Sequence, residues 1–237
     1  DTQGEFDLGS YVNTSYNGSA VVLSGGGLSG SYTSKVFDAG GDATWNNLSF
    51  VGGKGNFESL FGVDGAGGVY LSSDKGVSWT QQTSNYGGGA STSHMFSDSG
   101  YLYIIFSGTQ KEIWRSSNLG LTWSVVNDSF SNSALLVGGA DKSDNLYVAT
   151  GPGDVYKSSN YGVSWGLQGD FNSGTSNAKG IAINSSGAIY VVDGNAEVYV
   201  SSDSGVSWTQ QTSDYGGGGA GTDDMAVNRS GDLFILF

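Results

Sequence analysis

Ser72-Ser-Asp-Lys-Gly-Val-Ser-Trp79 is the first of four stretches that repeat without gaps along this chain of 237 residues. The other three are Ser116-Ser-Asn-Leu-Gly-Leu-Thr-Trp123, Ser158-Ser-Asn-Tyr-Gly-Val-Ser-Trp165 and Ser201-Ser-Asp-Ser-Gly-Val-Ser-Trp208. Their tryptophans are 44, 42 and 43 residues apart. This regular spacing indicates a repeat architecture, in which each unit stacks on the next.

Each repeat has room for four strands. In the last full unit, β-branched and aromatic runs cover residues 181–183, 188–192, 197–200 and 206–210, with polar or glycine-containing turns between them. None of these runs has the spacing of an amphipathic helix, so they predict strands. Four strands in a unit of this length are typical of a β-propeller blade. The sequence therefore predicts an all-β fold of four-stranded antiparallel blades.

The two ends of the chain are predicted to share one further blade. Four complete units lie between them, and two strand-like runs remain at each end. Pairing these runs would leave no exposed sheet edge. We therefore predict a five-bladed β-propeller over residues 19–237, with its last blade closed by strands from both termini. Residues 1–18 would form an N-terminal extension with one extra strand. The four end strands are expected at residues 19–23, 32–37, 225–227 and 233–237.

The repeated Ser-x-Asp-x-Gly-x-x-Trp pattern resembles the Asp-box, or bacterial neuraminidase repeat, of sialidases and several other propeller proteins. We expect the carboxylate to accept N–H groups of its own turn, the glycine to supply a positive φ, and the tryptophan to pack between sheets. Asn118 and Asn160 replace the acid in two boxes, which suits a structural acceptor and not a catalytic acid. Structural roles are therefore expected for Asp74, Gly76, Trp79, Asn118, Gly120, Trp123, Asn160, Gly162, Trp165, Asp203, Gly205 and Trp208.

Composition excludes several classes of function. The formal net charge is −13, from 9 basic and 22 acidic residues, which argues against nucleic-acid partners and anionic membranes. No apolar run is long enough to cross a membrane. The chain has no cysteine and one histidine, so disulfides, cysteine-ligated zinc and multi-histidine metal sites are excluded. We expect no cofactor and no metal. The acidic composition and the start at Asp1 favour a secreted or cell-surface protein.

The loops that follow the boxes each carry an aromatic residue six or seven positions after the tryptophan. Nearby amides, carboxylates and glycines suit sugars, whose C–H groups stack on rings and whose hydroxyls pair with polar side chains. The alternative is that these aromatics fill the gap between blades, as core aromatics commonly do. The candidate ligand-binding residues are Asn85, Tyr86, Phe130, Phe171, Asp214 and Tyr215.

The sequence argues against enzymatic activity. Sialidases hold the substrate carboxylate with three arginines, whereas this chain has only Arg115 and Arg229. Another glycosidase would need two carboxylates about 5–10 Å apart, and the acids on the expected binding face are more typical of solvated surface charges. His94 is interpreted as a hydrogen-bonded structural residue, and residues 141–145 as a capped turn in preference to a calcium site. The acids in question are Glu112, Glu197, Asp223 and Asp224.

Three functions remain, and we order them as follows. The first is a secreted or surface-exposed glycan-binding, lectin-like module in adhesion, with several weak sites on repeated loops. The second is a structural or assembly subunit of an extracellular appendage or fibre. The third is a glycosidase other than a sialidase. The expected partners are glycans or other extracellular proteins, and the sequence predicts no enzyme, no nucleic-acid partner and no insertion into a membrane.

Overall fold

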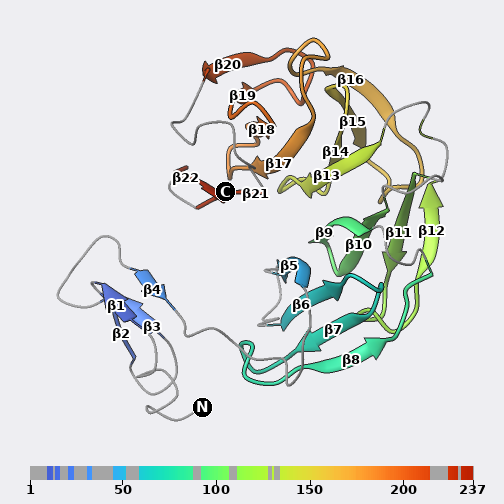
Figure 1. Ribbon diagram of the computed structural model, residues 1–237, viewed down its shortest axis with the longest axis vertical. Coiled ribbons are helices and arrows are strands. Elements are labelled where there is room, and N and C mark those ends of the chain that lie inside the picture. Colours follow the sequence, from blue (N-terminus) through green and yellow to red (C-terminus); the bar gives the residue numbers. More distant parts are fainter. Residues whose placement is uncertain are drawn as a thin grey trace.

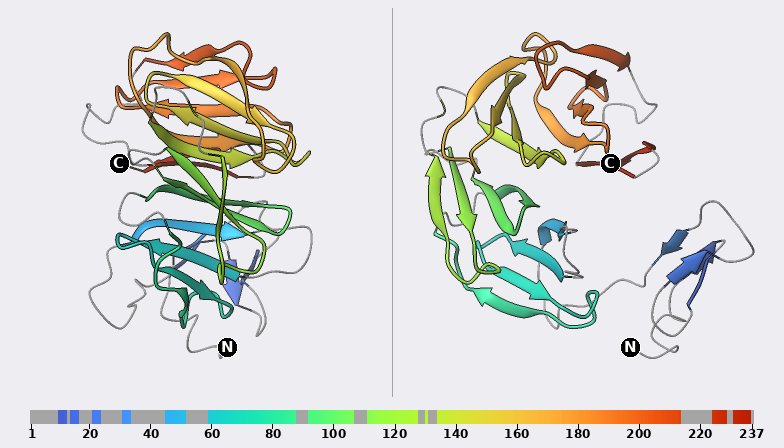
Figure 2. Two further views of the ribbon diagram at one scale, coloured as in Figure 1. Left: turned by 90° about the vertical axis from the view of Figure 1, so that its right-hand side faces the viewer. Right: turned by 180° about the vertical axis from the view of Figure 1, so that it is seen from behind.

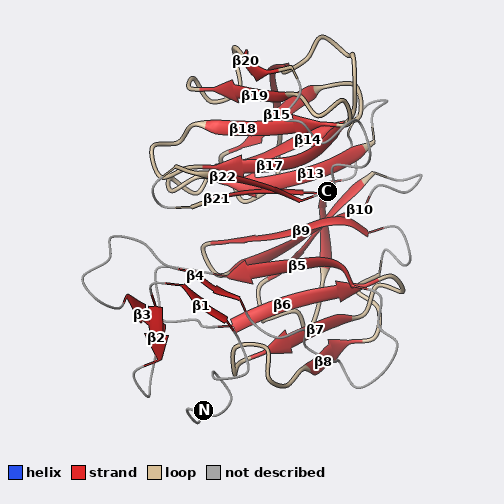
Figure 3. Ribbon diagram, turned by 60° about the vertical axis from the view of Figure 1, so that its left-hand side comes forward, coloured by secondary structure: helices blue, strands red, loops and turns tan. Residues whose placement is uncertain are grey.

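The computed structural model consists of antiparallel β-sheets throughout its described part (Figure 1; Figure 3). Those residues contain no helix, and hence none of the length and apolar character that a membrane span requires. The structure describes residues 10–12, 14–16, 21–23, 31–33, 45–51, 59–87, 92–106, 111–127, 130, 134–213, 224–228 and 231–236.

Four sheets of four strands follow one another along the chain, and we call them blades 1 to 4. The strands of each blade pair in chain order. Blade 1 contains β5 (Trp45–Val51), β6 (Ser59–Asp64), β7 (Val69–Ser72) and β8 (Thr80–Thr83). Blade 2 contains β9 (Thr92–Asp98), β10 (Tyr101–Phe106), β11 (Glu112–Ser116) and β12 (Ser124–Asn127). Blade 3 contains β13 (Leu135–Ala140), β14 (Leu146–Thr150), β15 (Asp154–Ser158) and β16 (Gly166–Asp170), and blade 4 contains β17 (Ala178–Ile183), β18 (Ile189–Asp193), β19 (Val198–Ser201) and β20 (Thr209–Thr212).

The blades are arranged around an arc with their first strands innermost (Figure 1). The inner strands β5, β9, β13, β17 and β21 (Asp224–Val227) pack against one another in that order. The fourth strand of each blade lies at the outside and pairs on one side only. This is the layout of a β-propeller, as the repeat length predicted.

The fifth sheet has two strands among the described residues, β21 and β22 (Leu233–Leu236), and its expected closure by the N-terminus is not confirmed. Instead, β3 (Val21–Leu23) pairs with β2 (Thr14–Tyr16), and β4 (Ser31–Thr33) pairs with β1 (Ser10–Val12). These strands lie apart from β22 in Figure 1 and in the rear view of Figure 2. Pairing between strands close in sequence closes a shorter loop than pairing with the far end of the chain. The described part of the first 18 residues thus contains two strands, where one was expected.

The hydrophobic core lies between successive blades. Phe96 of blade 2 shares a buried cluster with Val148 of blade 3, and Tyr147 of blade 3 shares another with Val191 of blade 4. All five residues of β14 are buried, because this strand has a neighbouring blade on each face. A strand covered on both faces reads as a continuous apolar run, which explains Leu-Tyr-Val-Ala-Thr in the sequence.

Two glycines allow neighbouring blades to approach closely. A Cβ atom at Gly180 of β17 would lie 2.5 Å from the backbone nitrogen of Met225 on β21. A Cβ atom at Gly169 of β16 would lie 2.7 Å from the carbonyl oxygens of Gly205 and Val206. No side chain fits at such distances from a backbone that is already packed. The turn of blade 4 therefore rests directly on the outer strand of blade 3.

Candidate functional site

The repeated turn between the third and fourth strands is held together by its serine and its acid. In blade 1, Ser72 Oγ accepts the N–H of Gly76 at 2.7 Å and donates to Asp74 Oδ1 at 2.7 Å. Asp74 Oδ1 also accepts the N–H of Ser78 at 2.9 Å, and Oδ2 accepts the Ser78 hydroxyl. Both oxygens of the acid thus accept hydrogen bonds within its own turn. Blade 4 has the same four bonds at Ser201, Asp203, Gly205 and Ser207.

Blades 2 and 3 reverse the direction of one of these hydrogen bonds. Asn118 Oδ1 accepts the N–H of Thr122 at 2.9 Å, but Asn118 Nδ2 donates to Thr122 Oγ1 at 2.8 Å. Asn160 and Ser164 form the same pair of bonds in blade 3. A hydroxyl can donate to a carboxylate or accept from an amide, so it satisfies either partner. The turn is closed in the same way with or without a charge.

Each of these turns contains two consecutive residues with positive φ. The four glycines have φ between 83° and 91°, and the residue before each glycine has φ between 58° and 64°. Val77 N–H donates to the Asp74 carbonyl at 3.4 Å across the two residues, as in a type I′ turn. The sequence did not indicate the first of the two positions, because its residues are not typical of left-handed backbone. They are Lys75, Leu119, Tyr161 and Ser204.

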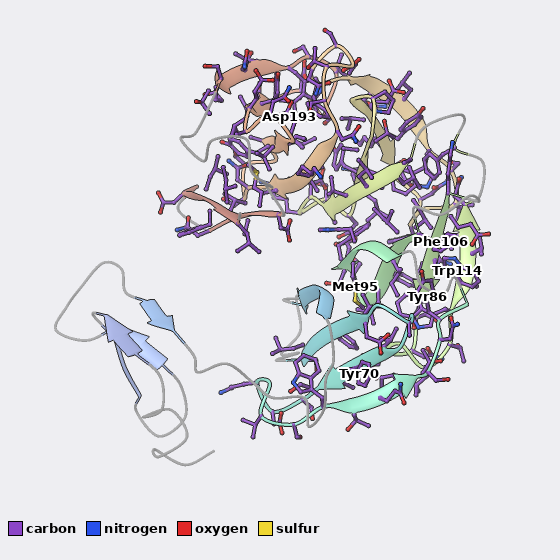
Figure 4. The ribbon with its side chains drawn as sticks, in the orientation of Figure 1. Tyr70, Tyr86, Met95, Phe106, Trp114 and Asp193 are labelled. Atoms are coloured by element: carbon purple, nitrogen blue, oxygen red, sulfur yellow. The ribbon has the colours of Figure 1, made fainter. Side chains whose placement is uncertain are left out.

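Three of the four loop aromatics that we named as ligand-binding residues are described, and they lie in the core instead. Tyr86 and Phe171 are 3% exposed and Phe130 is 8% exposed. Tyr86 packs edge-on against Trp114 and Trp123 of blade 2, with ring centroids 5.7 and 6.1 Å away (Figure 4). This agrees with the alternative, that the rings fill the gap between blades.

The same arrangement of one loop ring against two aromatics of the next blade recurs between blades 2 and 3 and between blades 3 and 4. Phe130 contacts Tyr156 and Trp165 of blade 3, and Phe171 contacts Tyr199 and Trp208 of blade 4. In each case the loop leaving one blade inserts its ring between two aromatics of the following blade. Burying a whole aromatic side chain is more favourable than leaving it in a solvated loop. None of the three rings has a free face on which a sugar could stack.

The remaining members of the candidate set give no binding platform in the described residues. Asn85 is exposed, and its Oδ1 accepts the N–H of Gly87 at 2.7 Å, so it shapes its own loop. Asp214 and Tyr215 lie outside the described residues. Of the two tyrosines in the candidate set, Tyr86 is therefore a core residue, and Tyr215 stays a prediction.

Two carboxylates considered for glycoside hydrolysis are engaged by their own hairpins. Glu112 accepts the indole N–H of Trp114 at 2.8 Å. Glu197 accepts the Tyr199 hydroxyl at 2.8 Å and the Gln210 amide at 2.9 Å. They belong to blades 2 and 4, with blade 3 between them. Each acid orients an aromatic residue of the third strand, and the two do not form a pair.

His94 lies buried on the inner strand β9. Burial lowers the pKa of His94 below its ordinary value of 6.5, while the charge of Asp224 and a hydrogen bond to the backbone of Gly138 act in the opposite direction. Three inner strands, β9, β13 and β21, thus contribute to the surroundings of the histidine. Asp223, the other acid considered beside Asp224, lies outside the described residues.

The turn at residues 141–145 is capped by its own aspartate. Asp141 Oδ1 accepts the N–H groups of Ser143 at 2.8 Å and Asn145 at 3.1 Å, and Oδ2 accepts the Tyr147 hydroxyl at 3.1 Å. Burial raises the pKa of Asp141, but these hydrogen bonds outweigh it and hold the pKa below the ordinary value. Within the described ranges, no group of three or more His, Cys, Asp or Glu residues could hold a metal ion.

Asp193 is a buried acid that the sequence did not single out (Figure 4). Its carboxylate accepts the N–H groups of Asn195 at 2.9 Å and Glu197 at 3.1 Å, and Asn172 from the blade 3 loop donates to it at 3.2 Å. Burial raises the pKa of Asp193 despite these bonds. Asp64 occupies the same position in blade 1 and accepts the N–H of Gly68. An aspartate followed by glycine at the end of the second strand of a blade is therefore the sequence pattern that could have predicted this structural acid.

The outer hairpins, each made of the third strand, the turn and the fourth strand, differ in the side chains they expose. After the Asp or Asn of the turn, blades 1 and 4 have Lys75 and Ser204, and in the fourth strand they have Gln81 and Gln210. The matching residues of blades 2 and 3 are apolar and exposed. We call Leu119, Leu121, Val125, Tyr161, Val163 and Leu167 the apolar patch; their exposed fractions range from 38% to 58%.

The two halves of the apolar patch are tied together by Arg115. Its guanidinium donates to the backbone carbonyl of Tyr161 at 2.9 Å and lies 4.8 Å from the ring centroid of Tyr101. The Tyr101 and Tyr161 rings are in contact, with centroids 5.5 Å apart. Both Arg115 and Tyr101 belong to blade 2, whereas Tyr161 belongs to the turn of blade 3. The exposed turn of blade 3 is thus held in a fixed position relative to blade 2.

Comparison with known proteins identifies the fold. No protein-family model and no curated protein matches the sequence. Among solved structures, YCF48 bound to D1 peptide is 14% identical, with a TM-score of 0.60 over 82% of this chain and 62% of that chain. For a nidogen–laminin complex the identity is 13% and the TM-score is 0.65, over 82% of this chain and 72% of that chain. For a gluconolactonase from Xanthomonas campestris the identity is 16% and the TM-score is 0.62, over 81% of this chain and 70% of that chain. The chain therefore has the fold of a β-propeller and spans less than two thirds of YCF48.

These structures correct the prediction that the chain is not an enzyme. Besides the gluconolactonase, they include a GH74 enzyme from Niastella koreensis and virginiamycin B lyase from Staphylococcus aureus. The prediction was wrong because the arginine count and the solvated carboxylates test only for sialidases and other glycosidases. Too few arginines exclude one way of binding a substrate carboxylate, and they say nothing about enzymes that do not bind their substrate in that way.

Proposed function

We propose that this chain is an Asp-box β-propeller module that binds protein partners through the apolar patch, at the cell surface or after secretion. The observation that carries the proposal is the patch itself, six apolar side chains exposed on two adjacent outer hairpins. Scattered exposed apolar residues are ordinary, but apolar residues gathered at matching positions of neighbouring repeats mark an interaction surface.

Three further observations support protein binding over glycan binding. The three described loop rings that would have stacked on sugars, Tyr86, Phe130 and Phe171, are buried. Two propellers of similar fold, YCF48 bound to D1 peptide and the nidogen–laminin complex, are complexes with a peptide and with a protein partner. The turns beneath the patch carry Asn118 and Asn160 in place of aspartate, so a partner would not have to desolvate a carboxylate there.

The test uses substitutions at one aligned position of the turn. Leu121→Lys with Val163→Lys alters the patch, while Val77→Lys with Val206→Lys alters the same position in blades 1 and 4. The four side chains are exposed to similar extents, between 51% and 59%, so both double variants should fold alike. The measurement is affinity capture from the extracellular fraction of the source organism, with a glycan array beside it.

We expect the wild type and the Val77→Lys/Val206→Lys control to retain the same proteins, and the Leu121→Lys/Val163→Lys variant to lose them. The proposal is refuted if both double variants retain the same proteins, because the patch would then not be the contact. It is also refuted if the wild type binds glycans on the array and both variants keep that binding.

A further inference from the structure

The boundary between blades 3 and 4 contains a carboxylate that solvent does not reach. Asp193, at the end of β18, has an exposed fraction of 0% (Figure 4). Its Oδ1 accepts the N–H groups of Asn195 and Glu197, and its Oδ2 accepts an amide N–H of Asn172 at 3.2 Å. All three donors are neutral. A buried carboxylate without a paired cation is costly to keep ionised, because it has lost its hydration.

The same carboxylate holds the loop that connects the two blades. Asn172, which donates to it, lies on this loop and is 6% exposed. The residue before it is Phe171, whose ring packs against Tyr199 and Trp208 of blade 4. Two consecutive residues of the loop, a ring and an amide, thus contact blade 4. A change in the charge of Asp193 therefore acts directly on the contact between the loop and blade 4.

The aligned positions of the other blades do not hold a loop in this way. The residue aligned with Asp193 stands four positions after the one paired with the box serine, and it is Phe106 in blade 2 and Thr150 in blade 3. In blade 1 it is Asp64, which is half-buried and accepts hydrogen bonds only from its own hairpin. Among the described residues, a carboxylate at this position holds the preceding loop only between blades 3 and 4.

The electrostatic surroundings of Asp193 favour its protonated form. Burial raises the pKa of Asp193, and the charge of Glu197 acts in the same direction, while the three hydrogen bonds oppose both without cancelling them. The other charged or titratable residues of the surrounding elements are Asp154, Asp170, Lys179, Tyr199 and Asp224. Lys179, the cation of this set, is exposed. Within the described part of the chain, no buried cation compensates Asp193.

We propose that the contact between this loop and blade 4 is a pH-sensitive switch, which opens when Asp193 is ionised and closes when Asp193 takes up a proton. A protonated carboxyl brings no charge into the core, and its carbonyl oxygen still accepts the two backbone N–H groups. An ionised carboxylate regains hydration when the loop with Asn172 moves away from it. The switch goes beyond the proposed function, because it lies at a boundary loop and not on the apolar patch.

The dependence on pH has a defined sign. A carboxyl whose pKa is higher in the folded state destabilises the fold when ionised, and this cost disappears as the pH falls through the folded pKa toward 3.8. The contact should therefore tighten between neutral pH and about pH 4. Burial lowers the pKa of His94, so its protonation opposes folding in the same range. Variants compared at one pH share this effect of His94, and their difference isolates Asp193.

Hydrogen exchange of the backbone amides, measured by mass spectrometry at about pH 7 and about pH 4.5, tests the switch. After correction for intrinsic exchange rates, residues 171–177 and 193–197 of the wild type should exchange at least about threefold more slowly at the lower pH. Asp193→Asn keeps an acceptor oxygen and removes the charge, so this difference should disappear. Asp64→Asn is the matched control, since it removes the aligned carboxylate of blade 1, and should leave the difference unchanged.

Asn172→Asp supplies a second variant with the opposite effect, and it keeps the test decisive if Asp193→Asn does not fold. It places a second carboxylate against Asp193, and two carboxylates that share a site take up a proton more readily. The loop should then exchange faster than in the wild type at neutral pH and recover at the lower pH.

Three outcomes overturn the proposal. The first is a wild type whose exchange at residues 171–177 and 193–197 does not change with pH after correction. The second is an Asp193→Asn variant that keeps the wild-type difference between the two pH values. The third is an Asn172→Asp variant whose difference is no larger than that of the wild type.

Discussion

Blades 1 and 4 share one version of the outer hairpin, and blades 2 and 3 share another. The strands, the serine, the glycine and the tryptophan are common to both versions, and the turn has the same two residues with positive φ. The acid of blades 1 and 4 accepts a hydroxyl hydrogen, and the amide of blades 2 and 3 donates to a hydroxyl. The fold therefore requires an acceptor at Oδ1, and the second polar atom is free to change.

This freedom separates stability from surface chemistry. Because the charge of the turn is not needed to close it, two blades carry an aspartate followed by a polar residue in the turn, while two carry a neutral asparagine followed by an apolar residue. The comparison can be tested at three levels, from features that both classes share to the atom that distinguishes them.

The largest effect is expected for the loop aromatics, which both classes use in the same way. Tyr86→Ala after blade 1 and Phe130→Ala after blade 2 should each lower the free energy of unfolding by about 3–5 kcal/mol, because each leaves a cavity between two aromatic rings. Chemical denaturation measures this loss. Phe130→Leu, which keeps an apolar side chain, should lose clearly less. If either alanine variant were as stable as the wild type, that ring would not be part of the core.

An intermediate effect is expected for the turn serines. Ser72→Ala and Ser158→Ala remove the acceptor of a buried glycine N–H and should each cost about 1–3 kcal/mol. Since Ser72 and Ser158 make the same bonds, the losses should agree between the two classes. Thermal unfolding measures both, with the exposed Ser73→Ala as the control. A loss in only one class would show that aspartate and asparagine do not close the turn equally.

The smallest effect is expected for the exchange of Asp and Asn. Hydrogen bonds from the Ser207 hydroxyl and N–H and from Ser201 lower the pKa of Asp203 from 3.8 to about 2. A carboxyl whose pKa is lower in the folded state stabilises the fold above pH 4, and this contribution is lost as the pH falls toward 2. Burial raises the pKa of Asp74, but the bonds from Ser78 outweigh it and the pKa falls there as well.

At neutral pH, Asp74→Asn/Asp203→Asn should therefore be nearly as stable as the wild type. Between pH 4 and pH 2 its stability should fall less steeply, because two of the titrating groups are gone. Unfolding midpoints over this pH range provide the measurement. A wild type and a double variant with parallel profiles would mean that the turn carboxylates do not contribute to the acid sensitivity.

The sequence predicted the parts of this fold that repeat. Four gap-free boxes set the strand order of four blades, and the spacing of their tryptophans gave the blade length. It did not predict the pairing of the N-terminal strands, because an alternation pattern specifies a face of a strand and not its partner. The burial of Tyr86, Phe130 and Phe171 was left as one of two alternatives. The sequence of a polar loop does not indicate which aromatic residues of the next blade its own aromatic will contact.

The sequence contained enough information to predict part of the apolar patch, but the sequence analysis did not predict it. Aligning the four hairpins position by position shows Lys75, Leu119, Tyr161 and Ser204 in one column. The constant residues of the motif define the turn, and the information about the surface lies in its variable residues. Exposure was also needed, because Leu121 or Leu167 in a strand-rich chain would otherwise be assigned to the core.

The loop rings give the repeat array a direction. Blade 1 supplies a ring to blade 2, blade 2 to blade 3, and blade 3 to blade 4, so each blade is completed by the one before it in the chain. In such an array, cooperativity passes between nearest neighbours. A blade that opens also withdraws the ring it donates, and thereby weakens the blade that follows it. Local fluctuations should consequently spread toward the C-terminus more readily than toward the N-terminus, as a polarity of amide exchange along the chain.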